Sequence, residues 1–106
     1  MDERYYTIKI AAGLCGMHEQ SLRMYERRGL IAPRRSAGNI RHFSDADVER
    51  IRFIKRLVDD LGVNLAGVEV IMHMRQQLLE GQQELELLRR AYEKAIGGAR
   101  GGAKAI

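Results

Sequence analysis

The sequence predicts a mainly helical fold, with two short helices, a small β-hairpin and a longer helix followed by a long amphipathic arm. Three observations support this prediction. Apolar residues recur at helical spacing along most of the chain, long runs of β-branched and aromatic residues are missing, and glycines and a single proline separate the helical segments. With 106 residues, the chain has room for one domain with a small core.

Two short helices begin the predicted fold. Thr7 can cap a helix over residues 8–15, because its hydroxyl can accept a hydrogen bond from the first turn, and Gly16 ends that helix. A second helix is predicted over residues 18–28, and Gly29 ends it. A helix, a short glycine turn and a second helix within so short a stretch of sequence have the spacing of a helix-turn-helix.

A β-hairpin is predicted next. Pro33 forbids continuation of a helix, and residues 36–39 read Ser-Ala-Gly-Asn, which is turn chemistry. Residues 30–31 before this turn and residues 40–43 after it could form two short antiparallel strands. A hairpin that carries arginines directly after a helix-turn-helix is a wing.

The third and fourth helices have start and stop signals. Ser44 and Asp47 form an Asp variant of the capping box, which predicts a third helix over residues 45–61. Gly62 ends this helix, and Asn64 can cap a fourth helix that starts directly after it.

The fourth helix has a heptad pattern. Alternating a and d positions are apolar apart from Gly81, and a single amphipathic helix needs a second surface to bury such a stripe. We therefore predict that two copies of the chain pair through it. The predicted dimerisation residues are Ile71, Met74, Leu78, Leu85, Leu88 and Tyr92. The alternative is a long helix that folds back on its own domain.

Positive charge is concentrated around the helix-turn-helix. The formal net charge is +4 and the pI is about 9.6, but residues 23–41 alone hold six Arg against one Glu. From residue 61 onward, six basic residues face five acidic ones. Arg presents a planar fork of donors that suits phosphates and base edges, so the local charge predicts double-stranded DNA as the partner.

The second helix is the predicted recognition helix. Its first turn would lie nearest the bases in the major groove, where Gln20 can pair with adenine, while the arginines of its flank and of the wing would reach phosphates or the minor groove. The predicted DNA-contact residues are His18, Gln20, Ser21, Arg23, Tyr25, Arg27, Arg34, Arg35 and Arg41.

Some of these residues have a second interpretation. Tyr25 could lie mostly in the core with only its hydroxyl outside. For Arg27 and Arg28 the alternative is a surface ion pair or no partner at all. Their candidate partners are Glu26 and Glu49.

No catalytic or metal-binding motif is apparent. The three His fall on separate elements without metal-ligand spacing, and there is no nucleophile elbow, C-x-x-C, H-E-x-x-H or phosphate-binding glycine loop. The single cysteine, Cys15, is expected to be a small packed side chain. Neither a signal peptide nor a long apolar run is present. The sequence therefore predicts a cytoplasmic protein that is no enzyme and has no metal, cofactor or membrane partner.

Together these residues resemble a known family. The pattern T-I-x5-L-x-G-x5-L-R-x-Y-E-x2-G-L-x2-P-x-R over residues 7–35, followed by R-x-F-S-x2-D-V over residues 41–48, resembles the MerR family of winged-helix regulators. Three further stretches are similar to its heat-shock repressor branch, the HspR-like proteins. They are G-M-H-x-Q-S-L-R at 16–23, R-R-S-A-G at 34–38 and G-V-N-L-A-G-V at 62–68.

The resemblance implies more than the spacing does. Members of the family are homodimers joined by an antiparallel coiled coil, and they bind inverted repeats in promoters. The heat-shock branch represses chaperone operons, with the chaperone DnaK in the role of co-repressor, which implies a location at the bacterial nucleoid. Carried onto this chain, the family's contacts fall at Gln20, Ser21, Arg23 and Tyr25 in the helix and at Arg41 in the wing.

The predicted organisation has three parts. Residues 1–62 form a winged helix-turn-helix DNA-binding domain, residues 63–96 a helical linker and coiled-coil dimerisation arm, and residues 97–106 a disordered Gly-rich tail. The expected function is repression of heat-shock or chaperone operons from inverted-repeat promoter sites.

Two alternative functions make different demands on the sequence. An effector- or stress-sensing activator would need a ligand pocket beyond the coiled coil, where this chain has only the Gly-rich residues 97–106. A coiled-coil adaptor that uses its basic face for an acidic protein has no need of an Arg-bearing hairpin beside a helix-turn-helix.

Overall fold

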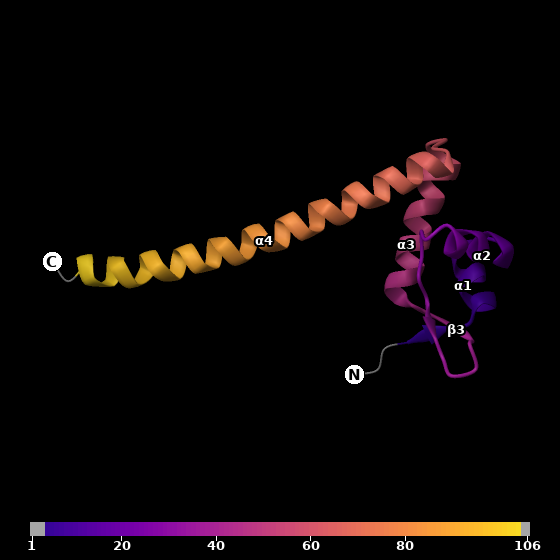
Figure 1. The fold of residues 1–106 in the computed structure, drawn as a ribbon, viewed down its shortest axis with the longest axis horizontal. Helices are drawn as coiled ribbons and strands as arrows, with labels where there is room; N and C mark the ends of the chain where they lie inside the picture. The colour runs from indigo at the N-terminus through magenta and orange to yellow at the C-terminus, as the bar shows by residue number, and fades with distance from the viewer. Residues whose placement is uncertain (1–3, 105–106) are drawn as a thin grey trace. The chain divides into compact units, whose positions relative to one another are not determined.

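The fold is taken from a computed structural model, which describes the backbone of residues 4–104 and the side chains of residues 4–98. The chain divides between Glu69 and Val70 into two compact units. The first unit contains β1 (Tyr5–Tyr6), α1 (Ile8–Cys15), α2 (Glu19–Arg27), β2 (Arg34–Arg35), β3 (Arg41–Ser44), α3 (Asp45–Lys55) and the π-helical turn η1 (Arg56–Asp60). The long helix α4 (Leu65–Lys104) begins in the first unit and runs through the second (Figure 1).

The mainly helical fold class with a small antiparallel sheet is confirmed. The division between the units lies farther along the chain than the predicted boundary after residue 62. The first turn of α4 belongs to the first unit, because Val68 is fully buried there.

The helix-turn-helix forms where the sequence predicts it. The Thr7 hydroxyl accepts a hydrogen bond from the N–H of Ile10 at 3.3 Å, and α1 starts at the next residue. Gly16 ends α1 with φ of 65°, a left-handed conformation that costs glycine little. α2 then starts at Glu19, with His18 as an extended N-cap residue whose side chain makes no capping bond.

The wing differs from its predicted form in one strand. β3 pairs with β2, so the hairpin uses Arg34–Arg35 instead of residues 30–31. Leu30 and Ile31 are buried in the core, where two apolar side chains gain more than they would in a short edge strand. Arg35 lies directly across from Arg41, and the connecting turn holds Asn39 at φ of 61°.

The sheet has a third strand that the sequence did not predict. β1 pairs with the other edge of β3, giving the order β1-β3-β2, with Tyr6 opposite Phe43. A strand of two residues is too short to produce an alternating pattern, so the sequence predicts no strand before Thr7. Residues 1–3 lie outside the described part of the chain.

The predicted capping box of α3 and the predicted cap of α4 are both confirmed. The Ser44 hydroxyl accepts from the N–H of Asp47 at 3.0 Å, and the Asp47 carboxylate accepts from the N–H of Ser44 at 2.8 Å. The predicted helix over residues 45–61 is α-helical only to Lys55 and continues as η1. Asn64 Oδ1 accepts from the N–H of Gly67 at 2.8 Å, the predicted cap of α4.

The core of the first unit lies between its helices and β3. α1 contacts α2, α3 and β3, and α3 also contacts β3; Figure 1 shows α1 and α2 beside α3. The largest fully buried side chains of this unit are Phe43, Leu22, Ile51, Ile54 and Val68. Cys15 is also buried, as predicted, and its thiol donates to the carbonyl of Val48 at 3.8 Å. Burial raises the pKa of this thiol, which keeps it protonated and unreactive.

α4 extends beyond its predicted end. The sequence predicted a disordered tail over residues 97–106, whereas the backbone is helical through Lys104. No proline interrupts this stretch, and Ala, Arg and Lys between its glycines favour continuation of a helix that is already formed. Residues 105–106 lie outside the described part of the chain. Among the helices of the described residues, none combines the length and apolarity needed to cross a membrane.

Candidate nucleic-acid interface

α2 separates its side chains sharply between core and solvent. Leu22 and Tyr25 are buried, whereas His18 and Gln20 are exposed and Ser21 is half-buried. The exposed residues belong to the N-cap and first turn of the helix, where the helix dipole is positive. Within the described residues, the N–H of Ser21 donates to the carbonyl of His18, whereas those of Glu19 and Gln20 have no backbone partner. This turn can therefore present both side chains and N–H donors to an anionic or hydrogen-bonding surface.

Arg23 forms an ion pair within α2. Its Nη2 lies 3.2 Å from Oε1 of Glu19, one helical turn earlier, and both side chains are partly exposed. Exposed pairs at this spacing contribute only a few tenths of a kcal/mol. Arg23 can therefore exchange Glu19 for a phosphate at little cost.

Tyr25 has a different environment from the other predicted contacts. It is only 4% exposed, and burial, followed by the nearby charge of Asp59, raises the pKa of its hydroxyl. Its ring lines a hollow beside η1 that Lys55 and Asp59 also line. The interpretation as a core residue, which the sequence left open, fits this burial better than a role as an exposed contact.

The two arginines at the end of α2 do not use the predicted carboxylates. Arg28 pairs with Glu69 at 3.0 Å. Arg27 is exposed, and within residues 4–98 its side chain forms no ion pair or hydrogen bond. Glu49 instead pairs with Arg52 at 2.7 Å. Of the two arginines, Arg27 is the one that is available to an external anion.

Glu26 joins α2 to the wing. Its Oε1 accepts from Nε of Arg41 at 2.7 Å and from Nη2 of Arg35 at 3.1 Å, and its Oε2 accepts from the same Nη2 at 3.0 Å. Partial burial alone raises the pKa of this carboxyl group, but the hydrogen bonds from Arg41 and Arg35 outweigh it, so the pKa lies below its ordinary value. The hydrogen bonds from Arg41 and Arg35 thus favour the ionised form of the Glu26 carboxyl group, which lowers its pKa.

The other arginine of the wing lies in a separate cluster. Arg34 pairs across the hairpin with His42, and its Nη1 donates to the hydroxyl of Tyr5 at 3.1 Å. Its guanidinium also lies 5.9 Å from the centre of the Tyr5 ring, and that ring meets His42 edge-on. Adjacent residues of a strand point to opposite faces, so the side chains of Arg34 and Arg35 lie on opposite faces of the wing.

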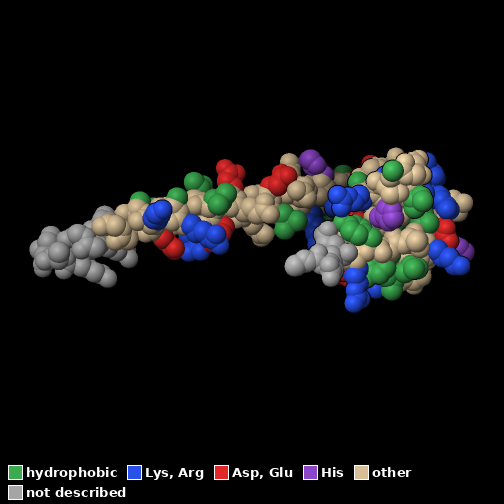
Figure 2. Space-filling view, turned by 90° about the horizontal axis from the view of Figure 1, so that it is seen from below, with side chains coloured by type: hydrophobic (Ala, Val, Ile, Leu, Met, Phe, Trp, Pro, Cys, Tyr) green, Lys and Arg blue, Asp and Glu red, His purple; other side chains and the backbone are tan. Residues whose placement is uncertain are grey.

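Sequence reasoning missed the role of Glu26. It considered this residue only as a partner for Arg27 and Arg28, which are its neighbours in sequence. The usable signal was that Glu26 is the one acidic residue among the six arginines of residues 23–41. Figure 2 shows one face of the first unit, on which Lys and Arg side chains are scattered among other groups.

The predicted dimerisation stripe is exposed on α4. Met74, Leu78, Leu85, Leu88 and Tyr92 all have more than half of their surface open to solvent, and Ile71 is half-buried. Figure 2 shows hydrophobic side chains, coloured green, at the surface along this helix. Such a row of large apolar side chains on a single helix is typical of a surface that a partner covers.

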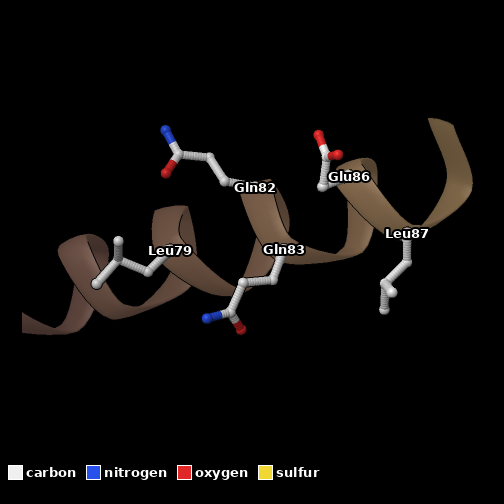
Figure 3. A pocket seen from close by; sticks show the side chains of 5 residues that line it. All are labelled: Leu79, Gln82, Gln83, Glu86 and Leu87. Atoms are coloured by element: carbon white, nitrogen blue, oxygen red, sulfur yellow. The ribbon is translucent and has the colours of Figure 1, made fainter. Parts of the chain in front are cut away.

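A second set of side chains lines an open hollow on the same helix. Leu79 and Leu87 are exposed and line this hollow together with Gln82, Gln83 and Glu86. Neither leucine occupies an a or d position. In Figure 3, Gln82 and Glu86 point to one side of the helix while Gln83 and Leu87 point to the other. These groups do not converge on a common point. Within the described residues, there is also no cluster of three His, Cys, Asp or Glu that could hold a metal ion.

Comparison with known proteins identifies the family. A model described as "MerR HTH family regulatory protein" matches residues 6–75. The chain belongs to the MerR family. The matched region covers the helix-turn-helix, the wing and the first part of α4, so every predicted MerR contact residue lies inside it.

Individual relatives agree with this assignment. The chain is 40% identical over 94 residues to "Putative heat shock protein HspR" of Streptomyces coelicolor, a match that covers 89% of this chain and 62% of that protein. It is 46% identical over 68 residues to "HTH-type transcriptional regulator MlrA" of Salmonella typhimurium, covering 63% of this chain and 28% of that protein. This MerR chain therefore spans less than two thirds of the length of these relatives.

A solved structure has the same fold. The crystal structure of HiNmlR, described as a MerR family regulator lacking the sensor domain and bound to promoter DNA, matches with a TM-score of 0.60 at 24% identity. The match covers 85% of this chain and 76% of that one. The MerR fold assigned from residues 6–75 is thus also found by comparison of structures.

Proposed function

We propose that this chain is a homodimeric, sequence-specific DNA-binding repressor of heat-shock or chaperone operons, which binds inverted repeats in promoters. The observation that carries the proposal is the division of α2, which buries Leu22 and Tyr25 and leaves the polar N-terminal turn exposed. A helix with one apolar side and a polar first turn can be held by its own domain while it enters a major groove. The heat-shock assignment is supported by the similarity to the Streptomyces coelicolor protein.

The roles of the contacts follow from their chemistry. Gln20 is exposed in the first turn and can pair with the N6 and N7 edge of adenine, so it reads sequence. His18 and Ser21 flank it and donate to bases or phosphates. Arg23 and Arg27 contact phosphates, which adds affinity without adding sequence preference.

Two-fold symmetry of the site follows from dimerisation. In the proposed dimer, the exposed stripe of α4 forms an antiparallel coiled coil with the same stripe of a second copy. Two recognition helices related by a two-fold axis require two half-sites related in the same way, which is an inverted repeat.

Binding to selected DNA tests this function. Duplexes enriched from a random pool by the purified protein are expected to contain an inverted repeat and to bind far more tightly than scrambled duplexes. Arg23→Ala should weaken binding to both kinds of duplex and lower the salt dependence by about one phosphate contact. Gln20→Ala should relax the choice of base at one position of each half-site. Equal retention of selected and scrambled duplexes at moderate salt would refute the function.

The proposed co-repressor is a DnaK-type chaperone. If the chaperone acts in this way, adding it should tighten binding to the selected duplex, and an unfolded client protein should reverse the effect. A binding curve that is unchanged by the chaperone would remove it from the proposal while leaving DNA binding intact.

A further inference from the structure

The wing carries two arginines that face each other directly. Arg35 and Arg41 are Cα partners in the antiparallel pair of β2 and β3, so their side chains lie on the same face of the hairpin. Like charges in this arrangement destabilise a hairpin. An anion placed between the two arginines would offset this repulsion, whether or not DNA is present.

Glu26 supplies that anion from an unfavourable position in its own helix. It lies in the last turn of α2, where the helix dipole disfavours a carboxylate. Its contacts with Arg35 and Arg41 compensate for this cost, since charge-assisted hydrogen bonds are about twice as strong as neutral ones. The position of Glu26 is thus explained by the wing and not by the helix.

The two arginines are held differently by Glu26. Arg41 is half-buried and bonds to the carboxylate through Nε, while within the described residues its two terminal amino groups have no hydrogen-bond partner. Both terminal amino groups of Arg35 are engaged, because Nη1 donates to the carbonyl of Asn39 at 2.9 Å and Nη2 donates to Glu26. A guanidinium anchored through Nε keeps four N–H donors for another anion.

We propose that Glu26 is a positioning residue that sets the specificity of DNA binding. It anchors Arg41 so that the terminal amino groups of this side chain are presented to a DNA phosphate, and it uses Arg35 as a brace that fixes the turn of the wing to α2. Arg35 is then no phosphate contact. This inference rests on the proposed DNA-binding function.

The proposal links the wing to the recognition helix. Because one carboxylate fixes the wing to α2, Arg41 meets its phosphate only when α2 is seated in register in the major groove. Binding to a wrong sequence, in which α2 is displaced, loses the anchored contact as well. Glu26 thereby increases the difference between right and wrong sequences without touching a base.

Variants with matched charge test this link. Glu26→Gln removes the carboxylate and raises the net charge by one. Glu49→Gln makes the same change on α3, where the one ion pair of Glu49 within residues 4–98 is with Arg52. Relative to Glu49→Gln, we expect Glu26→Gln to bind the selected duplex about ten-fold more weakly and a scrambled duplex equally well, as expected for loss of one charged hydrogen bond. In an Arg41→Gln background, Glu26→Gln should cause no further loss.

Four results would overturn the proposal. The first is that Glu26→Gln and Glu49→Gln bind both duplexes alike, and the second is that Glu26→Gln tightens binding to the selected duplex. The third is that the loss persists undiminished without Arg41, since a purely structural role would persist there. The fourth concerns the slope of log affinity against log salt concentration. Arg41→Gln should lower this slope by about 0.9, and Arg35→Gln should leave it unchanged. Equal slopes for the two variants would contradict the assignment of Arg35 as a brace and Arg41 as a phosphate contact.

The controls separate this inference from the function on which it depends. If the wild-type protein fails to distinguish selected from scrambled duplexes, the proposed function is wrong. If the wild type discriminates and Glu26→Gln behaves like Glu49→Gln, only the inference is wrong. The salt slopes of the two Arg variants test the inference even if Glu26→Gln does not fold.

Discussion

Ile51 and Ile40 have the same side chain in opposite surroundings. Ile51 on α3 is 0% exposed in the core, while Ile40 in the turn of the wing is 57% exposed. Ile51→Ala is expected to lower the free energy of unfolding by about 2–5 kcal/mol, because it removes buried methylenes and leaves a cavity. Ile40→Ala should change it by less than about 0.5 kcal/mol. Urea unfolding at fixed protein concentration measures both, and a similar loss for the two would contradict the described core.

Glu26 also predicts a pH dependence of stability. Its pKa is lowered in the folded state from the ordinary 4.5 by Arg41 and Arg35, which overcome the effect of burial. As the pH falls, the carboxyl group of the unfolded chain therefore takes up its proton first. The stability that ionised Glu26 adds to the fold is complete above the ordinary pKa and is lost as the pH falls through the folded pKa.

The matching measurement compares the wild type with Glu26→Gln. The free energy of unfolding of the wild type is expected to fall more steeply than that of the variant as the pH decreases below about 4.5. If the unfolding free energies of the wild type and the variant ran parallel from neutral pH down to about pH 3, ionised Glu26 would not stabilise the fold.

Single residues were predictable from sequence where their bonds are local. Thr7, Ser44 and Asn64 each bond a backbone N–H three residues ahead, so a short pattern contains the whole interaction. Glu26 and Arg41 are fifteen residues apart and meet only because the hairpin folds back beside α2. No local pattern encodes that contact, and for the same reason the burial of Tyr25 was left undecided.

At the scale of elements, helices were more predictable than strands. α1 and the start of α4 lie where capping residues and glycines place them, and each helix has enough turns to produce a periodic pattern. β1 and β2 have only two residues each, which is too few for alternation to be recognised. Their pairing depends on β3 and on the packing of the sheet.

The capping box makes a testable prediction for α3. Ser44→Ala removes the hydroxyl that accepts from the N–H of Asp47 and should lower the free energy of unfolding by about 1 kcal/mol. Ser36→Ala changes a serine in the exposed turn of the wing and serves as the matched control, with an expected effect near zero. Chemical denaturation measures the difference, and equal stability of the two variants would show that the cap adds nothing.

At the scale of the whole molecule, assembly depends on which apolar side chains of α4 are covered. Leu85 and Leu87 are 66% and 67% exposed, but only Leu85 belongs to the predicted stripe. In the proposed coiled coil, Leu85→Glu should weaken the dimer about a thousand-fold, because it replaces an apolar side chain of each copy by a carboxylate that the interface would bury. Leu87→Glu should leave the dimer intact. Sedimentation equilibrium over a range of concentrations distinguishes the two, and equal effects would place the interface elsewhere.

The central claim is that two copies of the chain present two recognition helices, each with its wing, to one duplex. Footprinting of the wild-type protein on a selected duplex with a small cleavage reagent tests it most directly. The expected result is two protected patches related by two-fold symmetry, with their centres one helical turn or a whole multiple of turns apart. A single unsymmetrical patch, or uniform weak protection along the duplex, would contradict the account.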